Sequence, residues 1–312
     1  MANLDFLKTE KFTTGYGNEI SGATSYDEVL KQAGLNWTVD VHPAFADFNG
    51  TMIPVPKTNV VVRTEDQKPL GIVSDKYKIV NNSDAFAFTE AIYDSRDIEF
   101  ICGGSYRDGS STWLEAKVTG EYSILGDKVE CYFIFMNSHD GTGSVKTLIV
   151  PNRVACSNAL NLPVKNGKIS RHWRCTHSGN PLEKINEASE VLLAGSSYMK
   201  TLTAECEMLQ EIKISLDWLD KSINELFPIT EDMTDEQKDK MIYRRDSLRD
   251  VYLFKDDLSD FGNTGYRFVS AVADYADHVE CRNTKNAVLN RKMLIAHGSD
   301  LVDRAYKMAI HA

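Results

Sequence analysis

The sequence predicts an α+β fold: an antiparallel sheet core with packed helices, followed by a mostly helical C-terminal region. Two observations predict it. Strand-like runs separated by turn signals fill residues 51–180, whereas after Pro181 apolar residues recur at three- and four-residue steps. A chain of 312 residues is long enough for one large domain or two smaller ones. We therefore expect an N-terminal arm over residues 1–50, an α+β sheet domain over 51–180 and a helical domain over 181–312.

The expected N-terminal arm is irregular apart from one short helix. This helix opens with a Ser-x-x-Glu capping box at Ser25 and Glu28 and closes on Gly34. The first hairpin follows, because residues 59–63 and a run from 71 to 80 flank a polar turn. A capped amphipathic helix is then predicted over residues 83–93.

A second group of strands completes the expected sheet. Residues 98–106 and 111–118 flank an Arg-Asp-Gly turn. Residues 128–136 form the most strand-like run and would pair with 145–150 across a Gly-rich turn. Residues 154–162 either begin a helix or cross over the sheet.

The last third of the chain has the pattern of a helical scaffold. Residues 182–226 have helical periodicity, 233–258 predict a charged second helix, and 264–279 and 287–310 predict two more. Leu, Ile and Met stripes at this spacing are core far more often than they are cofactor sites.

Charge is distributed unevenly along the sequence. Between Asn137 and His177 six cations stand against one acid, Asp140, in a chain whose formal charge is -10. The cations are Lys146, Arg153, Lys165, Lys168, Arg171 and Arg174. A basic island on an acidic protein predicts an anionic partner at this place.

The Gly-rich turn over residues 137–144 lies at the start of this island. Gly141 and Gly143 allow backbone amides to approach a ligand, and Thr142, Ser144 and His139 add side-chain donors. The turn is not a P-loop, because it lacks the Gly-Lys-Ser/Thr sequence and joins two strands. The alternative is a hairpin turn whose Asp-Gly pair supplies the positive φ that the turn needs.

The basic run after the turn combines cations with an aromatic ring. Lys165, Lys168, Arg171 and Arg174 fall within ten positions and surround Trp173. Cations that follow a backbone, with a ring on which a base stacks, are typical of a single-strand binding groove. Possible aromatic neighbours on the strands are Tyr106, Tyr132, Phe133 and Phe135. The alternative is a solvated loop whose Trp packs on the sheet.

The sequence patterns that would indicate metal binding or catalysis are weaker than the basic run. We therefore expect no metal and no cofactor. His172, Cys175 and His177, with or without His139, match no common structural zinc spacing. Two pairs of residues have the types that an enzyme would need. They are Asp140 beside His139, as base and orienter, and Glu115 with Lys117 on one face of a strand. Cys156 follows Arg153 closely, but a buried structural cysteine is the commoner case.

The location expected from the sequence is the cytoplasm. No apolar run approaches the ~20 residues of a membrane helix, and the first residues have no secretion signal. The six cysteines are spread out and form no Cys-x-x-Cys pair, as is usual for reduced cysteines in a cytosolic protein.

Several segments resemble one known family. They are residues 70–82 with the Phe-rich helix after them, 137–141, 151–160, Arg171 with His172, and 264–278. In order and spacing they resemble the phage/plasmid-like protein family, a domain of unknown function (number 932), from about Trp37 to the end. The resemblance implies a mobile-element context, and hence cytosolic expression in a bacterial host. A weaker similarity, at the level of the fold, is to the phage single-strand annealing proteins.

The leading hypothesis is a phage- or plasmid-encoded, non-catalytic protein that binds and anneals single-stranded DNA in recombination, as a homo-oligomer. Its candidate binding residues are Arg153, Lys165, Lys168, Arg171, Arg174, Trp173, His139, Gly141 and Gly143. A second hypothesis is a protein–protein interaction factor, such as an inhibitor of a host defence enzyme, whose acidic helices mimic nucleic acid. A third is a metal-dependent enzyme that acts on nucleic acid.

Overall fold

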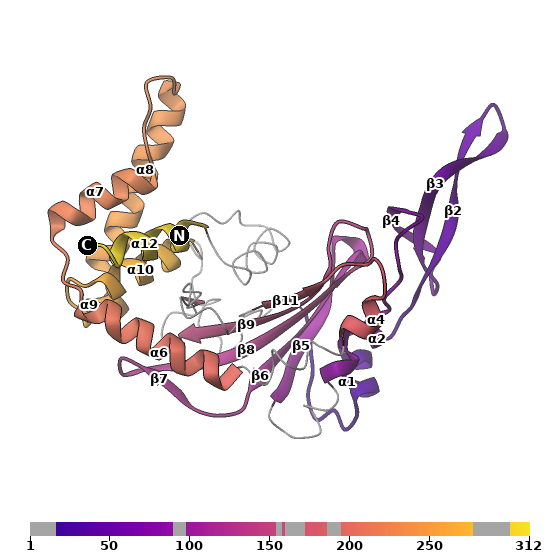
Figure 1. Ribbon diagram of the computed structural model, residues 1–312, viewed down its shortest axis with the longest axis horizontal. Coiled ribbons are helices and arrows are strands. Elements are labelled where there is room, and N and C mark those ends of the chain that lie inside the picture. Colours follow the sequence, from indigo (N-terminus) through magenta and orange to yellow (C-terminus); the bar gives the residue numbers. More distant parts are fainter. Residues whose placement is uncertain (1–16, 90–97, 154–157, 160–171, 186–194, 277–299) are drawn as a thin grey trace.

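A computed structural model of the chain describes residues 17–89, 98–153, 158–159, 172–185, 195–276 and 300–312. Within these ranges the strands form an eight-stranded and a three-stranded sheet, both antiparallel, and most helices follow Pro181. Figure 1 shows the larger sheet between the C-terminal helices on one side and the smaller sheet on the other. The predicted α+β fold is therefore confirmed. None of the described helices is long and apolar enough to cross a membrane.

The larger sheet has the strand order β1-β5-β6-β8-β9-β10, with β7 paired to β8 and β11 paired to β9. Its strands are β1 (Asn18–Glu19), β5 (Ile98–Tyr106), β6 (Ser111–Val118), β7 (Tyr122–Ile124), β8 (Asp127–Ser138), β9 (Val145–Arg153), β10 (Asn158–Ala159) and β11 (His172–Cys175). Both hairpins predicted for this region, β5–β6 and β8–β9, are confirmed. The β5–β6 turn has positive φ at Arg107, Asp108 and Gly109.

The smaller sheet has the order β2-β3-β4. Its strands are β2 (Val39–Phe48), β3 (Thr51–Arg63) and β4 (Lys68–Ser74). The predicted hairpin of β3 with β4 is confirmed, but two expectations are wrong. Residues 39–48 are not irregular, because they pair along β3 through a two-residue turn at Asn49 and Gly50, with φ of 51° and 84°. Residues 77–80 do not form the expected strand. In this segment the N–H of Lys78 donates instead to the carbonyl of His177 (2.9 Å).

Four of the described helices begin at side-chain caps, and the cap predicted at Ser25 is confirmed. Ser25, Ser215, Thr234 and Thr264 each accept a hydrogen bond from a backbone N–H in the first turn of the helix that follows. The capped helix predicted over residues 83–93 instead begins at Asn82, after Asn81, which makes no side-chain cap hydrogen bond. The α-helices are α1 (Tyr26–Gln32), α2 (Asn82–Phe86), α4 (Pro181–Ile185), α6 (Gly195–Glu211), α7 (Leu216–Leu226), α8 (Asp235–Phe254), α9 (Asp256–Ser259), α10 (Gly265–Asp274) and α12 (Asp300–Ala309). Short 3-10 turns lie at η2 (Ala87–Thr89) and η3 (Arg107–Gly109).

The hydrophobic core lies mainly on one face of the larger sheet. Strand alternation places Leu114, Phe133 and Phe135 on this face, in one cluster with Leu202 of α6 and Phe268 of α10. Because this cluster joins residues on both sides of Pro181, the helices cover the sheet instead of standing apart from it. Whether the regions 51–180 and 181–312 fold independently stays a prediction.

The opposite face, which we call the second face, holds a smaller cluster that includes Trp113, Tyr132, Ile134 and Leu148. Among the described residues, this cluster is made only by strands of the sheet itself. Its aromatic side chains are nevertheless buried, and so is Phe133 on the helix-covered face. Tyr132, Phe133 and Phe135 are therefore core residues, and the expectation that they help to stack bases is wrong.

Candidate nucleic-acid interface

The Gly-rich turn between β8 and β9 packs against strand β4 of the smaller sheet. A Cβ built on Gly71 would lie 2.3 Å from the Cα of Asp140. Gly141 has a φ of +76°, and a Cβ there would lie 3.0 Å from Cγ1 of Val73. The glycines on both sides of this contact permit the two backbones to approach. The turn is thus part of the packing between the two sheets.

The carboxylate of Asp140 accepts hydrogen bonds from its own turn, including those of Thr142, which was expected to help hold an anion. It accepts hydrogen bonds from the Thr142 amide (2.8 Å) and hydroxyl (2.7 Å) and from the Ser138 hydroxyl (2.7 Å). Burial tends to raise the pKa of Asp140, but the bonds from Thr142 and Ser138 outweigh it and the pKa lies below its usual value. A Cβ on Gly143 would lie 2.5 Å from the Cβ of Ser138, so this glycine also serves close packing. The structure therefore favours the hairpin-turn interpretation over an anion cradle.

His139 points away from solvent into a buried polar cluster. Its side chain is 1% exposed, and its Nε2 lies 3.0 Å from Oδ1 of Asn82. Asn82 Oδ1 also accepts from the Thr112 hydroxyl (2.9 Å), while Nδ2 of Asn137 donates to the carbonyl of Val80 (2.9 Å). Because Oδ1 is an acceptor, we assign the ring proton of His139 to Nε2. Burial lowers the pKa of His139 to about 3, so the ring is neutral at pH 7 and is not placed to hold a phosphate.

His177 joins β11 to the segment that follows β4. Its Nδ1 donates to the carbonyl of Lys78 (3.2 Å), and the ring stacks on Tyr77 with centroids 4.8 Å apart. The Tyr77 hydroxyl in turn donates to the carbonyl of Ser138 (3.0 Å). Burial lowers the pKa of His177 as well. The two histidines are therefore neutral groups at the junction of the two sheets.

The expected zinc candidates do not come together in the part of the chain that the structure describes. Cys175 is buried and faces the helix-covered core, whereas His177 binds Lys78. The described residues contain no group of three or more His, Cys, Asp or Glu that could hold a metal ion. The side chain of His172 lies outside the described part.

Arg153 was expected to contact phosphate, but its side chain is 1% exposed. Its Nε donates to Oδ2 of Asp127 (2.7 Å), and its Nη2 donates to the carbonyl of Asp257 (3.1 Å). The Asp257 carboxylate lies 3.7 Å from Nη1, and the guanidinium stacks over Phe261 at 5.1 Å. A buried cation held by two acids ties β9 to α9. Arg153 is thus a structural residue, and the expectation for it is corrected.

Lys146 and Arg174 are different, because they are accessible. They are register partners on β9 and β11, so strand alternation places both on the second face. Arg174 is exposed, Lys146 is half-buried, and among the described residues neither makes an ion pair with an acid. The pKa of Lys146 is lowered, first by burial and then by the charge of Arg174. The sequence counted Lys146 among the basic residues but did not pair it with Arg174, because pairing depends on the β9–β11 register.

Trp173 lies between these cations in sequence but faces the other way. It is the register partner of Thr147, is half-buried and packs against the helix-covered core. This placement is the one that the alternative interpretation of the basic run expected. Of the aromatic candidates, Tyr106 remains partly exposed, with the Arg107 guanidinium 5.7 Å from its ring centroid. Lys165, Lys168, Arg171 and Cys156 lie outside the described residues.

The acid–lysine pair on β6 also has partners. Glu115 and Lys117 share the second face, as strand alternation predicts, but Nζ of Lys117 binds Oε1 of Glu130 on β8 (2.7 Å). Burial tends to raise the pKa of Glu130, whereas Lys117 and the Tyr132 hydroxyl outweigh it and lower that pKa. Glu115 is fully buried, and the Cys102 thiol lies 3.6 Å from it. These contacts account for Glu115 as a buried group and for Lys117 as a half-buried partner of Glu130.

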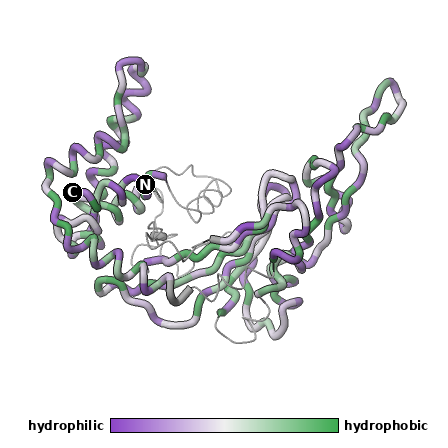
Figure 2. Tube along the Cα trace, viewed as in Figure 1, coloured by the Kyte–Doolittle hydropathy of each residue, from purple (hydrophilic) through white to green (hydrophobic). Residues whose placement is uncertain are grey.

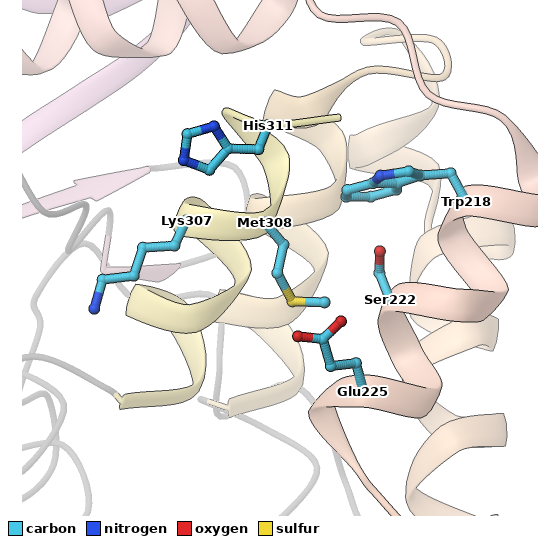
Figure 3. Close-up of a pocket in the computed structure, with 6 residues that line it drawn as sticks. All are labelled: Trp218, Ser222, Glu225, Lys307, Met308 and His311. Carbon is cyan, nitrogen blue, oxygen red and sulfur yellow. The ribbon is translucent and has the colours of Figure 1, made fainter.

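A pocket of about 390 Å³ opens between α7 and α12, among the C-terminal helices (Figure 3). It is lined by Trp218, Ser222, Glu225, Lys307, Met308 and His311. Because it combines an acid with a lysine, it has no evident preference for an anion, and it lies away from β11 (Figure 1). We therefore place the candidate interface at Lys146 and Arg174.

Comparison with known proteins identifies a family but no function. No curated protein and no solved structure matches the chain. A family model described as Domain of unknown function (DUF932) matches residues 69–294, a range that includes all of β4 except Lys68, the Gly-rich turn, β9 and β11. The chain belongs to this DUF932 family.

Proposed function

We propose that this DUF932 member binds single-stranded nucleic acid, without catalysis, at the cationic pair Lys146 and Arg174 on β9 and β11. The observation that carries the proposal is the direct cross-strand placement of two cations without an acidic partner among the described residues. Like charges opposite one another destabilise a sheet. An anion between them would relieve this repulsion, and a phosphate group has the required charge.

The surrounding sequence supports a polymer over a single small anion. Lys165, Lys168 and Arg171 precede Arg174 within ten positions, in a chain of net charge -10. A groove that follows a nucleic-acid backbone needs several cations in series, whereas a small anion needs only one or two. We extend the proposal to strand annealing in a phage or plasmid context and to a cytoplasmic location, on the resemblances described above.

The test is binding of a labelled oligodeoxythymidine at several salt concentrations. We expect K146Q/R174Q to weaken binding about tenfold at low salt and to reduce the slope of log affinity against log salt by about 1.4, because about 0.7 counterions are released per phosphate on single strands. K221Q/K240Q, which removes two exposed lysines of α7 and α8, is the matched control and should leave both values unchanged.

Two results would contradict the proposal. One is the absence of binding to the oligonucleotide at low salt. The other is an equal loss of affinity in K146Q/R174Q and in K221Q/K240Q, because the effect would then depend on net charge and not on the site.

The interaction-factor hypothesis depends on a continuous acidic face. Helix α8 carries five acids and five bases, and the helical period gathers its acids on one side: Asp235, Glu236, Asp239, Asp246 and Asp250. That hypothesis also expects the basic run to be buried or paired, whereas Arg174 is exposed. Pull-down from a host lysate remains the test of that hypothesis, and metal analysis of the purified protein remains the test of the enzyme hypothesis.

A further inference from the structure

The outer part of the β2–β3 hairpin projects from the rest of the molecule (Figure 1). Strand β4 pairs with β3 only between Thr58 and Arg63, so residues 43–56 form a two-stranded ribbon without a third strand. We call residues 43–56 the arm. Its tip is the turn at Asn49 and Gly50. Strand β4 therefore does not cover the arm.

The arm exposes an unusual amount of apolar surface. Phe48 is 66% exposed and Met52 61%, and Phe45, Ile53 and Val55 are also exposed. Asp47 is the only charged residue in these fourteen positions, although 26% of the whole chain is charged. Figure 2 shows hydrophobic colouring on the outer part of the arm. Together these side chains expose on the order of 400 Å² of apolar surface, divided between the two faces of the arm.

The two faces of the arm differ in charge. The register pairs Ala46 with Ile53 and Phe48 with Thr51, so these four residues share one face, and Val55 follows on the same face by alternation. Asp47 and its register partner Met52 lie on the other face. We call the first of these the uncharged face.

The edges of the arm are poorly suited to adding another strand. Pro43 lies on β2, and Pro54 and Pro56 lie on β3. Proline has no N–H to donate to a neighbouring strand and is a common device against edge pairing. The surface available to a partner is therefore the uncharged face and not a strand edge.

The charge of the arm selects among partners. Residues 43–56 contain no Lys or Arg, so the arm cannot neutralise the phosphates of nucleic acid or the anionic head groups of a lipid surface. Two copies of a chain with net charge -10 repel one another at close range, unless they meet where charge is absent. The uncharged face meets this condition and is complementary to itself.

We propose that the uncharged face of the arm packs against the same face of a second copy, as a two-fold symmetric contact. In an isologous interface each residue meets the same patch on its partner, so a face without charge places no like charges together. On the uncharged face Phe48, Ile53 and Val55 expose on the order of 250 Å² of apolar surface, about a third of the ~800 Å² per partner in a stable interface. We therefore expect a weak, reversible dimer that forms as the protein concentration rises.

The first test measures mass against protein concentration by analytical ultracentrifugation on the full chain. We expect the wild type to approach twice the monomer mass as concentration rises, and F48D/I53D to remain monomeric. M52D, on the opposite face of the arm, and F254D, at a side chain of α8 that is 73% exposed, are the matched controls and should dimerise as the wild type does. All three variants change exposed side chains, so circular dichroism should show an unchanged fold.

The second test uses a bifunctional thiol cross-linker. Ala46→Cys on the uncharged face should give a covalent dimer, whereas Asp47→Cys on the other face should not. A wild type that stays monomeric at every concentration would overturn the proposal. So would dimerisation of F48D/I53D, cross-linking of Asp47→Cys alone, or binding to neutral phospholipid vesicles that F48D/I53D abolishes without any change of mass.

Discussion

Strand β9 carries Lys146 near its start and Arg153 at its end, and the fold places these cations in opposite environments. Arg153 is buried and held by Asp127 and Asp257, whereas Lys146 faces Arg174 and makes no ion pair with an acid in the part of the chain that the structure describes. The two cations belong to the same basic stretch of sequence. The comparison teaches that a basic stretch contains both structural and available cations, and that acids from distant segments decide which are which.

The largest effect should come from removing the buried cation. Arg153→Ala removes the cation between Asp127 and Asp257, although Lys255 still lies 4.0 Å from Asp257. Breaking a buried ion pair in this way costs about 3–5 kcal/mol. Urea unfolding measures the loss. The triple variant R153M/D127N/D257N is the control and should recover much of the stability, since no uncompensated charge remains. If Arg153→Ala left the stability unchanged but abolished nucleic-acid binding, Arg153 would be a binding residue and not a structural one.

The second largest effect should be a loss of stability at acidic pH, caused by the neutral histidines His139 and His177 beside the Gly-rich turn. The folded pKa of His139 is about 3 and that of His177 is also lowered, while an unfolded His titrates near ~6.5. Below pH ~6.5 these histidines bind protons in the unfolded chain but not in the folded protein. The free energy of unfolding is therefore greatest above that pH and decreases as the pH falls towards 3. Each histidine contributes at most about 1.4 kcal/mol per pH unit.

The measurement is the free energy of unfolding between pH 7 and about 4.5, where carboxylates still contribute little. H139N should flatten the slope by about half, because His177 remains. H42N, at an exposed histidine away from this junction, is the control for the substitution itself. A wild-type stability that does not change in this window would contradict neutral, buried histidines.

A smaller effect should follow from substituting the turn glycine. Gly141→Ala places a Cβ at positive φ and 3.0 Å from Val73, which should cost about 1–2 kcal/mol of stability. Binding of nucleic acid should not change, because the turn packs between the sheets. Gly126 also has positive φ but no atom within 4 Å of its Cβ, so Gly126→Ala separates backbone strain from the contact with Val73. Loss of binding in a folded Gly141→Ala would restore the turn as an anion site.

The smallest expected effect is a gain in stability. Lys146→Gln removes a like-charge contact with Arg174 and should raise the free energy of unfolding by ~0.5 kcal/mol at low salt. Thermal unfolding at two salt concentrations measures it, since screening should abolish the gain. A destabilised variant would mean that Lys146 has a stabilising partner, and the proposed interface would lose its main support.

Part of the candidate site could be predicted from the sequence. The turn at residues 137–144, both of its flanking strands and the local excess of cations followed from turn residues, alternation and charge. The role of each cation did not follow, because Asp257 is more than a hundred positions from Arg153. The strand over residues 39–48 was missed although Asn49-Gly50 is a strong hairpin signal, because its outer half exposes apolar side chains instead of alternating in burial.

The sequence by itself determined the α+β class, the cap at Ser25, and the β5–β6 and β8–β9 hairpins. These features depend on neighbours within a few positions of the chain, where propensity and turn chemistry act. Only the tertiary structure decided that Asp140 holds its own turn, that Arg153 is buried and that Lys146 lies opposite Arg174. Those outcomes depend on which distant strands and helices meet, because burial and charge pairing are set by packing and not by local sequence.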